Sequence, residues 1–202
     1  MLRAMLLRFL AVGSLVVAAS TGCQHGGESD SSHGAVSSGE WLKAPNVDPS
    51  LAVPAESRRI LAHAVAAGTQ NYTCSKGAAD GGTQHTWSFA GPEATLNGAG
   101  GTPMGKHFAS SGGPAAPQWE TLDGTFVVGK KVAAFTPPAK GDIPWLLLHV
   151  ESHGGSGPLA QAQYVHRVNT HGGVAPSMPC DDAHLGKAEK VPYTADYFFY
   201  GP

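Results

Sequence analysis

Four residues in the middle of the chain carry side chains that could do chemistry together: His107, Trp119, Glu120 and Asp123. An imidazole and two carboxylates near a glycine-rich stretch could bind a metal ion or act as general acid and base. The indole of Trp119 could stack on a sugar or another flat ligand. The alternative places Trp119 in the core and Glu120 outside, because neighbouring residues of a strand point to opposite faces. These four residues are the candidate ligand-binding site, although their spacing matches no recognised ligand motif.

A second group of polar residues lies between positions 149 and 171 and comprises His149, His153, His166 and His171. His149 and Glu151 would share one face of a strand, and His166 could lie across from them. These imidazoles make His149 and His166 weak candidates for a divalent-metal site. The alternative is a set of scattered polar positions on a solvated face, because no HxH or HExxH spacing is present. We therefore expect no metal and no other cofactor.

Motifs for nucleophilic catalysis and phosphate binding are missing from the sequence. There is no GxSxG, and Gly154-Gly155-Ser156-Gly157 is typical of a glycine turn. There is also no GxxxxGK[ST]. The sequence thus leaves open whether the protein is an enzyme and favours a binding role.

The N-terminal residues differ in composition from the rest of the chain. Arg3 and Arg8 accompany an apolar run over residues 9–19, which ends in small residues. This order predicts a secretory signal peptide over residues 1–22, and the apolar run is too short for an ordinary membrane span. We therefore expect an exported protein.

Two processing sites are compatible with this signal. Thr21-Gly22-Cys23 resembles the bacterial lipoprotein box, although Ser20 stands where that box usually has Leu. Cys23 would then be acylated and would anchor the protein in a membrane of the cell envelope. Cleavage after Val17-Ala18-Ala19 is the alternative and would release a soluble secreted protein.

The cysteine count is consistent with lipidation. Of the three cysteines, Cys74 and Cys180 remain as one pair if Cys23 carries lipid. In an oxidising compartment we expect them to form a disulfide, which closes a loop of roughly 100 residues and contributes about 4 to 5 kcal/mol in the chain-entropy model. A free thiol pair or a metal site is the alternative, but neither cysteine belongs to a CxxC or CxxH motif.

Length and composition indicate one β-rich domain. The chain has 202 residues, a formal net charge of −2 and 14% charged residues, so no basic face indicates nucleic acid as a partner. Gly, Ser, His and Asp dominate the start of residues 23–50, which predicts a flexible tether after the lipid. Its last part is an extended lead-in that we expect to dock through Trp41 and Leu51. Residues 51–202 would form the single domain.

Several stretches predict strands that would position the candidate residues. The apolar run within residues 143–151 is typical of a buried strand, and residues 160–169 form its expected antiparallel partner. Asp123-Gly124 between two β-prone runs predicts a tight hairpin. The aromatic residues 193–200 predict a last strand laid into the sheet. We expect seven or eight short strands in a single antiparallel β-sandwich or a partly closed barrel.

Three further expectations concern the remaining elements. Residues 54–67 begin with proline and place apolar residues at helical spacing, which predicts one short N-terminal helix. The glycines around His107, over residues 98–113, predict a surface loop. Arg167, if buried between strands, would need a carboxylate, and Asp196 is the expected partner.

The chain also resembles the family called domain of unknown function 3455. The resemblance covers residues from about 50 to the end and rests on seven short blocks in the order of the family, which are Asn71-Tyr72-Thr73-Cys74, Trp87-Ser88-Phe89, Gly105-Lys106-His107-Phe108, Trp119-Glu120 with Asp123-Gly124, Ile143-Pro144-Trp145-Leu146-Leu147, Arg167-Val168-Asn169-Thr170 with Gly172-Gly173, and Val191-Pro192-Tyr193-Thr194-Ala195-Asp196-Tyr197. The resemblance implies an exported single-domain protein and no particular activity. A dehydrogenase label has no support, because no strand, GxGxxG turn and helix follow one another.

These observations favour an exported, lipid-anchored envelope protein that acts as a binding module. Its expected partners are a membrane, through the lipid, and a small-molecule or glycan ligand. Two alternatives remain open: a metal-assisted envelope hydrolase that uses His107 and Glu120, and a purely structural envelope component. The structural component would have no concave pocket lined by aromatic residues.

Overall fold

The computed structural model describes residues 38–79, 82–111 and 116–202 of the chain. The predicted signal peptide, Cys23 and the beginning of the tether lie outside the described residues. Within the described ranges, no helix is long and apolar enough to cross a membrane.

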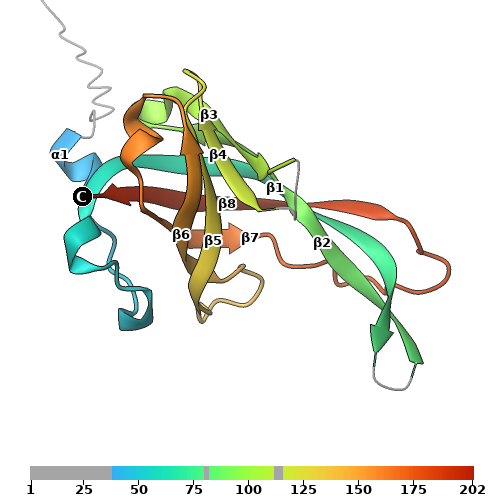
Figure 1. Cartoon of the computed structure of the whole chain (residues 1–202). Coiled ribbons are helices and arrows are strands. Elements are labelled where there is room, and N and C mark those ends of the chain that lie inside the picture. The colour runs from blue at the N-terminus through green and yellow to red at the C-terminus, as the bar shows by residue number, and fades with distance from the viewer. Residues whose placement is uncertain (1–37, 80–81, 112–115) are drawn as a thin grey trace, which may run out of the picture. The chain divides into compact units, whose positions relative to one another are not determined.

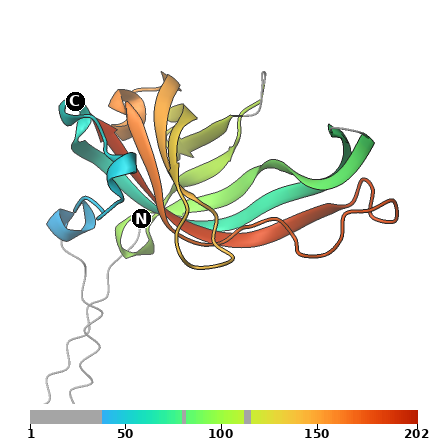
Figure 2. The same cartoon turned by 90° about the horizontal axis from the view of Figure 1, so that it is seen from below.

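The described residues form eight antiparallel strands that close into a ring (Figure 1). Each strand pairs with the next one in the chain, and the last pairs with the first. The strands are β1 Arg59–Ala79, β2 Gly82–Asn97, β3 Pro103–Ala109, β4 Pro117–Thr121, β5 Phe126–Phe135, β6 Trp145–Gly154, β7 Tyr164–Gly172 and β8 Ala188–Gly201. The ring is not a regular barrel, because the β1–β2 hairpin and the beginning of β8 extend well beyond the other strands (Figures 1 and 2). The mainly-β class is confirmed.

The short α-helix lies earlier in the chain than the sequence predicts. It is α1, Ser38–Trp41, and four 3₁₀ turns accompany it: η1 Pro49–Leu51, η2 Ala55–Ser57, η3 Ala99–Gly101 and η4 Pro158–Gln161. The helix predicted over residues 54–67 is wrong, since its first residues form η2 and the rest belong to β1.

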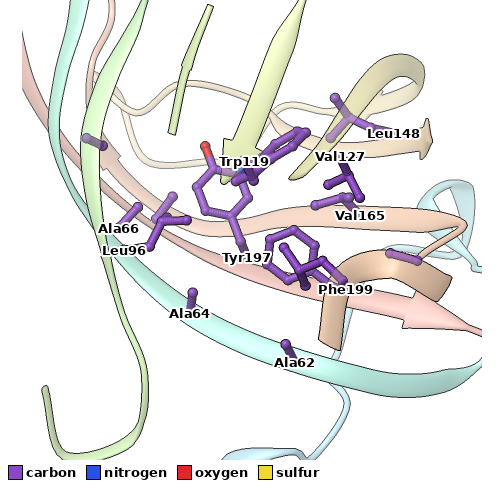
Figure 3. Packing of buried hydrophobic residues seen from close by; sticks show 14 of the residues in the cluster. Ala62, Ala64, Ala66, Leu96, Trp119, Val127, Leu148, Val165, Tyr197 and Phe199 are labelled. Atoms are coloured by element: carbon purple, nitrogen blue, oxygen red, sulfur yellow. The ribbon is translucent and has the colours of Figure 1, made fainter. Parts of the chain in front are cut away.

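Strand β1 shows why the helical spacing misled. Ala62, Ala64 and Ala66 are buried in the interior cluster, whereas His63 and Val65 between them are less buried, so burial follows the period of a strand. Figure 3 shows the three alanines along β1, facing the larger side chains of other strands. Pairing with β2 on one side and β8 on the other outweighs the helix propensity of alanine.

Buried side chains form two clusters, one on each face of the sheet. The interior cluster is built around Trp119, Tyr197 and Phe199 (Figure 3). The outer cluster consists of the lead-in residues Leu51 and Val53 packed on four residues of the sheet, namely Leu147, Val168, Phe198 and Tyr200. The predicted docking of the lead-in through Leu51 is thereby confirmed.

Trp41 also docks as predicted. Its ring stacks on the imidazole of His63 with centroids 4.2 Å apart, and its Nε1 donates to the carbonyl of His63 at 3.2 Å. The chain therefore contacts the outside of the ring before its first strand begins.

Two predicted hairpins are present, and one predicted loop is not. Strands β6 and β7 pair antiparallel, and β4 joins β5 through the Asp123-Gly124 turn, where Gly124 has a φ of 80°. The surface loop predicted over residues 98–113 is wrong for residues 103–109, which form β3 between β2 and β4, and residues 112–113 lie outside the described residues. Pairing on both edges satisfies the backbone of this glycine-rich segment.

Cys74 of β1 forms a disulfide with Cys180, in the segment before β8. The bridge spans 106 positions of sequence, in agreement with the predicted pairing. It fixes the extended part of β1 to the long connection between β7 and β8.

Candidate functional site

The interior of the ring contains a cavity of about 830 Å³. Inward-facing residues of all eight strands contribute to its wall, together with Ile143 and Pro144 from the β5–β6 connection. Phe89, Lys130 and Lys131 are exposed and lie at its rim. An interior of this size is typical of eight-stranded barrels that hold one small ligand.

The pair His107 and Trp119 forms one wall of the cavity. The two residues are opposite each other on β3 and β4, and their rings stack with centroids 4.6 Å apart and an angle of 7° between planes. Trp119 also makes edge contacts with Tyr197 and Phe199. A Cβ at Gly129 would lie 3.0 Å from the indole, so glycine at this position of β5 gives the ring its space.

The protonation state of His107 follows from its surroundings. Its Nδ1 lies 2.8 Å from the carbonyl oxygen of Gln118, so Nδ1 carries the proton and Nε2 keeps a lone pair. The pKa of His107 is lowered to about 3: burial is the largest cause, the contact with Gln118 opposes it, and the charge of Arg167 adds to the lowering. The imidazole is therefore neutral at physiological pH and offers one acceptor and no charge.

Two buried donors in the wall are not satisfied by ordinary hydrogen bonds. Trp119 Nε1 and Gln70 Nε2 have no hydrogen-bond partner among the described residues. Gln70 lies close enough to the Tyr193 hydroxyl to lower the pKa of Tyr193 slightly, against the larger rise caused by burial. Unsatisfied buried donors are uncommon in folded proteins, and each costs about 1 to 3 kcal/mol.

Arg167 supplies a positive charge to this wall. It pairs across β7 and β8 with Tyr197, whose ring belongs to the interior cluster, so Arg167 also faces inward. Its Nε and Nη2 both donate to the carbonyl oxygen of Pro144, at 3.1 and 2.8 Å. Burial raises the pKa of Tyr197, and the nearby guanidinium opposes this rise.

The predicted pairing of Arg167 with Asp196 is wrong. Asp196 is on the other face of β8, where it accepts a hydrogen bond from Asn169 Nδ2 at 2.7 Å and lies 3.4 Å from His63 Nε2. Alternation along β8 separates the two groups, because Tyr197 faces the interior and its neighbour Asp196 faces outward.

The carboxylates of the candidate site are not in the cavity wall. Glu120 follows Trp119 and points to the outer face, where its carboxylate lies 3.1 Å from Lys106 Nζ. Asp123 belongs to the β4–β5 turn and accepts hydrogen bonds from Thr121 Oγ1 and Thr125 N, at 2.6 and 2.9 Å. The structure thus brings together His107 and Trp119 and leaves Glu120 and Asp123 elsewhere.

The histidines considered for a metal are also apart. His166 is buried under the lead-in, with Nε2 2.7 Å from the carbonyl oxygen of Leu51 and Nδ1 3.0 Å from the Tyr200 hydroxyl. Its pKa is lowered by burial and raised by the contact with Leu51. His149 is exposed and pairs in register with Tyr164, two positions away from the residue opposite His166. The described residues contain no group of three or more His, Cys, Asp and Glu that could hold a metal ion.

The sequence predicts only two residues of the cavity wall, His107 and Trp119. Gln70, Tyr72 and Tyr197 line it as well, and the sequence does not single them out as site residues. A usable signal was the alternation in β7 and β8, which places Arg167 on the same face as the buried Val165. An arginine on a core-facing register position indicates a charge that needs a partner.

Comparison with known proteins identifies a family and nothing closer. A family model described as "Protein of unknown function (DUF3455)" matches residues 54–201. A search of the curated proteins and a search of the solved structures found no match. The matched range begins before β1 and ends at the last residue of β8, so it contains every strand of the ring.

Proposed function

We propose a function from the premise that the chain belongs to the DUF3455 family, a family of unknown function: the domain binds one small, largely apolar molecule inside its ring. The observation that carries this proposal is the cavity of about 830 Å³ with aromatic walls. Burial of apolar ligand surface contributes about 25 cal/mol per Å², so a molecule of modest size can bind there with useful affinity.

The character of the wall supports a small molecule with a flat apolar part. His107, Trp119 and Tyr197 close the floor of the cavity and are at most 2% exposed, while the exposed ring of Phe89 and the exposed Ala134 offer apolar surface at its mouth. A structural envelope component has no use for such a cavity, because a sheet ring of this size is most stable when side chains fill its interior. The binding role is therefore the better explanation of the two.

The metal-assisted hydrolase has less support. It requires His107 and Glu120 to act together, but these residues face opposite sides of the sheet. The neutral His107 could accept a proton from a bound molecule, yet its low pKa makes it a weak base.

The experiment uses N-phenyl-1-naphthylamine, a neutral dye whose fluorescence rises in apolar surroundings. The full chain with Cys23→Ser serves as the protein, since this change removes the proposed lipid and avoids detergent. We expect saturable binding of one dye molecule per chain.

Two variants on one strand locate the bound dye. Ala134 and Val132 are both exposed on β5, but only Ala134 lines the cavity. Ala134→Trp should reduce dye binding by about tenfold or more because the new ring occupies cavity space, while Val132→Trp should leave it unchanged. Absence of saturable binding, or equal effects of the two variants, would contradict the proposal.

We also propose that the domain acts outside the cytoplasm, held to a membrane of the cell envelope by lipid on Cys23. The composition of residues 1–22 supports export. The disulfide between Cys74 and Cys180 supports an oxidising compartment. Release as a soluble secreted protein is the alternative if Cys23 is not acylated.

A further inference from the structure

We infer that the molecule bound in the cavity is an apolar carboxylate whose acid group pairs with Arg167. This inference rests on the proposed function and specifies the chemical class of its ligand. The carboxylate would lie at the β7 wall of the cavity, and the apolar part would contact apolar lining residues such as Phe89 and Leu146.

The free hydrogen-bonding capacity of Arg167 is the first support. A guanidinium has five N–H donors, and the two contacts to the Pro144 carbonyl oxygen engage one on Nε and one on Nη2. Of the other three, one interacts with the hydroxyl oxygen of Tyr197, so two N–H groups remain for a ligand. The two contacts also hold the plane of the guanidinium in one orientation, which prepares it for the two oxygens of a carboxylate.

The charge balance of the cavity is the second support. Among the described residues, no carboxylate lies within 4.0 Å of the Arg167 guanidinium, so Arg167 has no ion pair there. Glu151, the carboxylate at the cavity wall, lies 3.3 Å from Lys130 Nζ instead. Lys131 adds another positive charge at the rim. The wall thus holds more positive than negative charge, and its innermost cation has no anionic partner.

The charge of Arg167 is the third support, because it acts on several neighbouring groups. It lowers the pKa of four buried or half-buried groups around the cavity, which are Tyr72, His107, Tyr193 and Tyr197, in each case beside a larger effect of burial. The Arg167 side chain is half-buried, so solvent screens its charge less than those of the exposed Lys130 and Lys131. An anion in the cavity would interact with it more strongly than at the protein surface.

The experiment compares two molecules of the same shape, 2-naphthoic acid and 2-naphthamide, at pH 7. Calorimetric titration into the full chain with Cys23→Ser gives both dissociation constants. We expect the acid to bind at least about tenfold more tightly than the amide, the effect of one charge-assisted hydrogen bond. Equal binding of the two would overturn the inference and leave the proposed function standing.

Two charge-removing variants identify the residue responsible. Arg167→Gln should abolish the preference for the acid, and a far-ultraviolet circular dichroism spectrum like that of the parent protein shows that the variant is folded. Lys131→Gln removes the same charge from the exposed rim and should change the preference by less than about twofold, because water and salt screen it. Loss of the preference in Lys131→Gln but not in Arg167→Gln would refute the assignment to Arg167.

Failure of the inference can be told from failure of the proposed function. If neither the neutral dye nor either naphthalene compound binds, both are wrong. If Arg167→Gln does not fold, Arg167→Lys is the second variant. It keeps the positive charge but loses the two parallel N–H donors of the guanidinium, so it should weaken the binding of the acid and leave the binding of the amide unchanged. In every case, the ratio of the dissociation constants of 2-naphthamide and 2-naphthoic acid, measured on the protein with Arg167 in place, decides the ligand class.

Discussion

The unsatisfied indole of Trp119 leads to an unusual stability prediction. Replacing a buried tryptophan by alanine costs about 3 to 5 kcal/mol, and Trp119 is only 1% exposed. In Trp119→Phe the smaller ring gives up about 1 to 2 kcal/mol of apolar burial and packing. The same change removes an N–H that has no partner among the described residues, a gain of about 1 to 3 kcal/mol. We therefore expect Trp119→Phe to change the free energy of unfolding by less than about 1 kcal/mol.

Urea unfolding followed by far-ultraviolet circular dichroism measures this change without relying on tryptophan fluorescence. Trp41→Phe is the matched control, because Trp41 Nε1 has a partner, the carbonyl oxygen of His63 at 3.2 Å. The control should lose about 1 kcal/mol through the missing hydrogen bond. A loss of more than about 3 kcal/mol in Trp119→Phe, at an unchanged dependence on urea, would refute the reasoning.

Three further predictions follow from the disulfide, the buried imidazole and the N-terminal cysteine. Replacing Cys74 and Cys180 by serine should lower the free energy of unfolding by about 4 to 5 kcal/mol, measured by urea unfolding, and an unchanged midpoint would contradict the role of the bridge. Burial lowers the pKa of His107 to about 3, so the unfolded chain binds a proton below pH 6.5 that the folded chain does not. Stability is thus complete above that pH and falls as the pH decreases, by about 2 kcal/mol between pH 7.5 and 5.0, and His107→Phe should remove that part of the fall. Cys23→Ser should abolish the incorporation of labelled palmitate in cells, whereas labelling that persists would exclude acylation of this cysteine.

The sequence predicts the strand content well where alternation and turn residues agree. The Asp123-Gly124 pair marks the β4–β5 hairpin correctly, but a two-residue turn would pair Thr121 with Phe126, whereas the structure pairs Glu120 with Phe126. The β6–β7 hairpin was similarly clear from its apolar runs. The sequence did not predict that the eight strands close into a ring, because β1 pairs with β8 between residues at least 115 positions apart, which leaves no local signal.

The two wrong element predictions have a common cause. Residues 54–67 and 98–113 were interpreted from local preferences, alanine for helix and glycine for loop. In the structure, residues 59–67 belong to β1 and residues 103–109 form β3. Each of these strands pairs with two partners, and the hydrogen bonds on both edges decide its conformation. Small side chains are useful there because they leave interior space for Trp119 and for the cavity.

The candidate site was predicted in part for a similar reason. His107 and Trp119 meet because β3 and β4 are neighbours, and both are bulky residues in short strands. Glu120 and Asp123 were grouped with them by distance along the chain, although the strand period turns Glu120 outward. Arg167 comes from a strand on the other side of the ring, so only the closed sheet shows that it faces the same space.

The pairing of the first strand with the last has a consequence for how this protein matures. Arg59 is the first residue of β1 and pairs with Gly201 at the end of β8. The hydrogen bonds that close the ring therefore join a strand that is synthesised early to one that is synthesised late. Such distant pairing slows folding. Until β8 has been synthesised, one edge of β1 has no pairing strand. During that time the extended β1–β2 hairpin can pair with strands of other molecules.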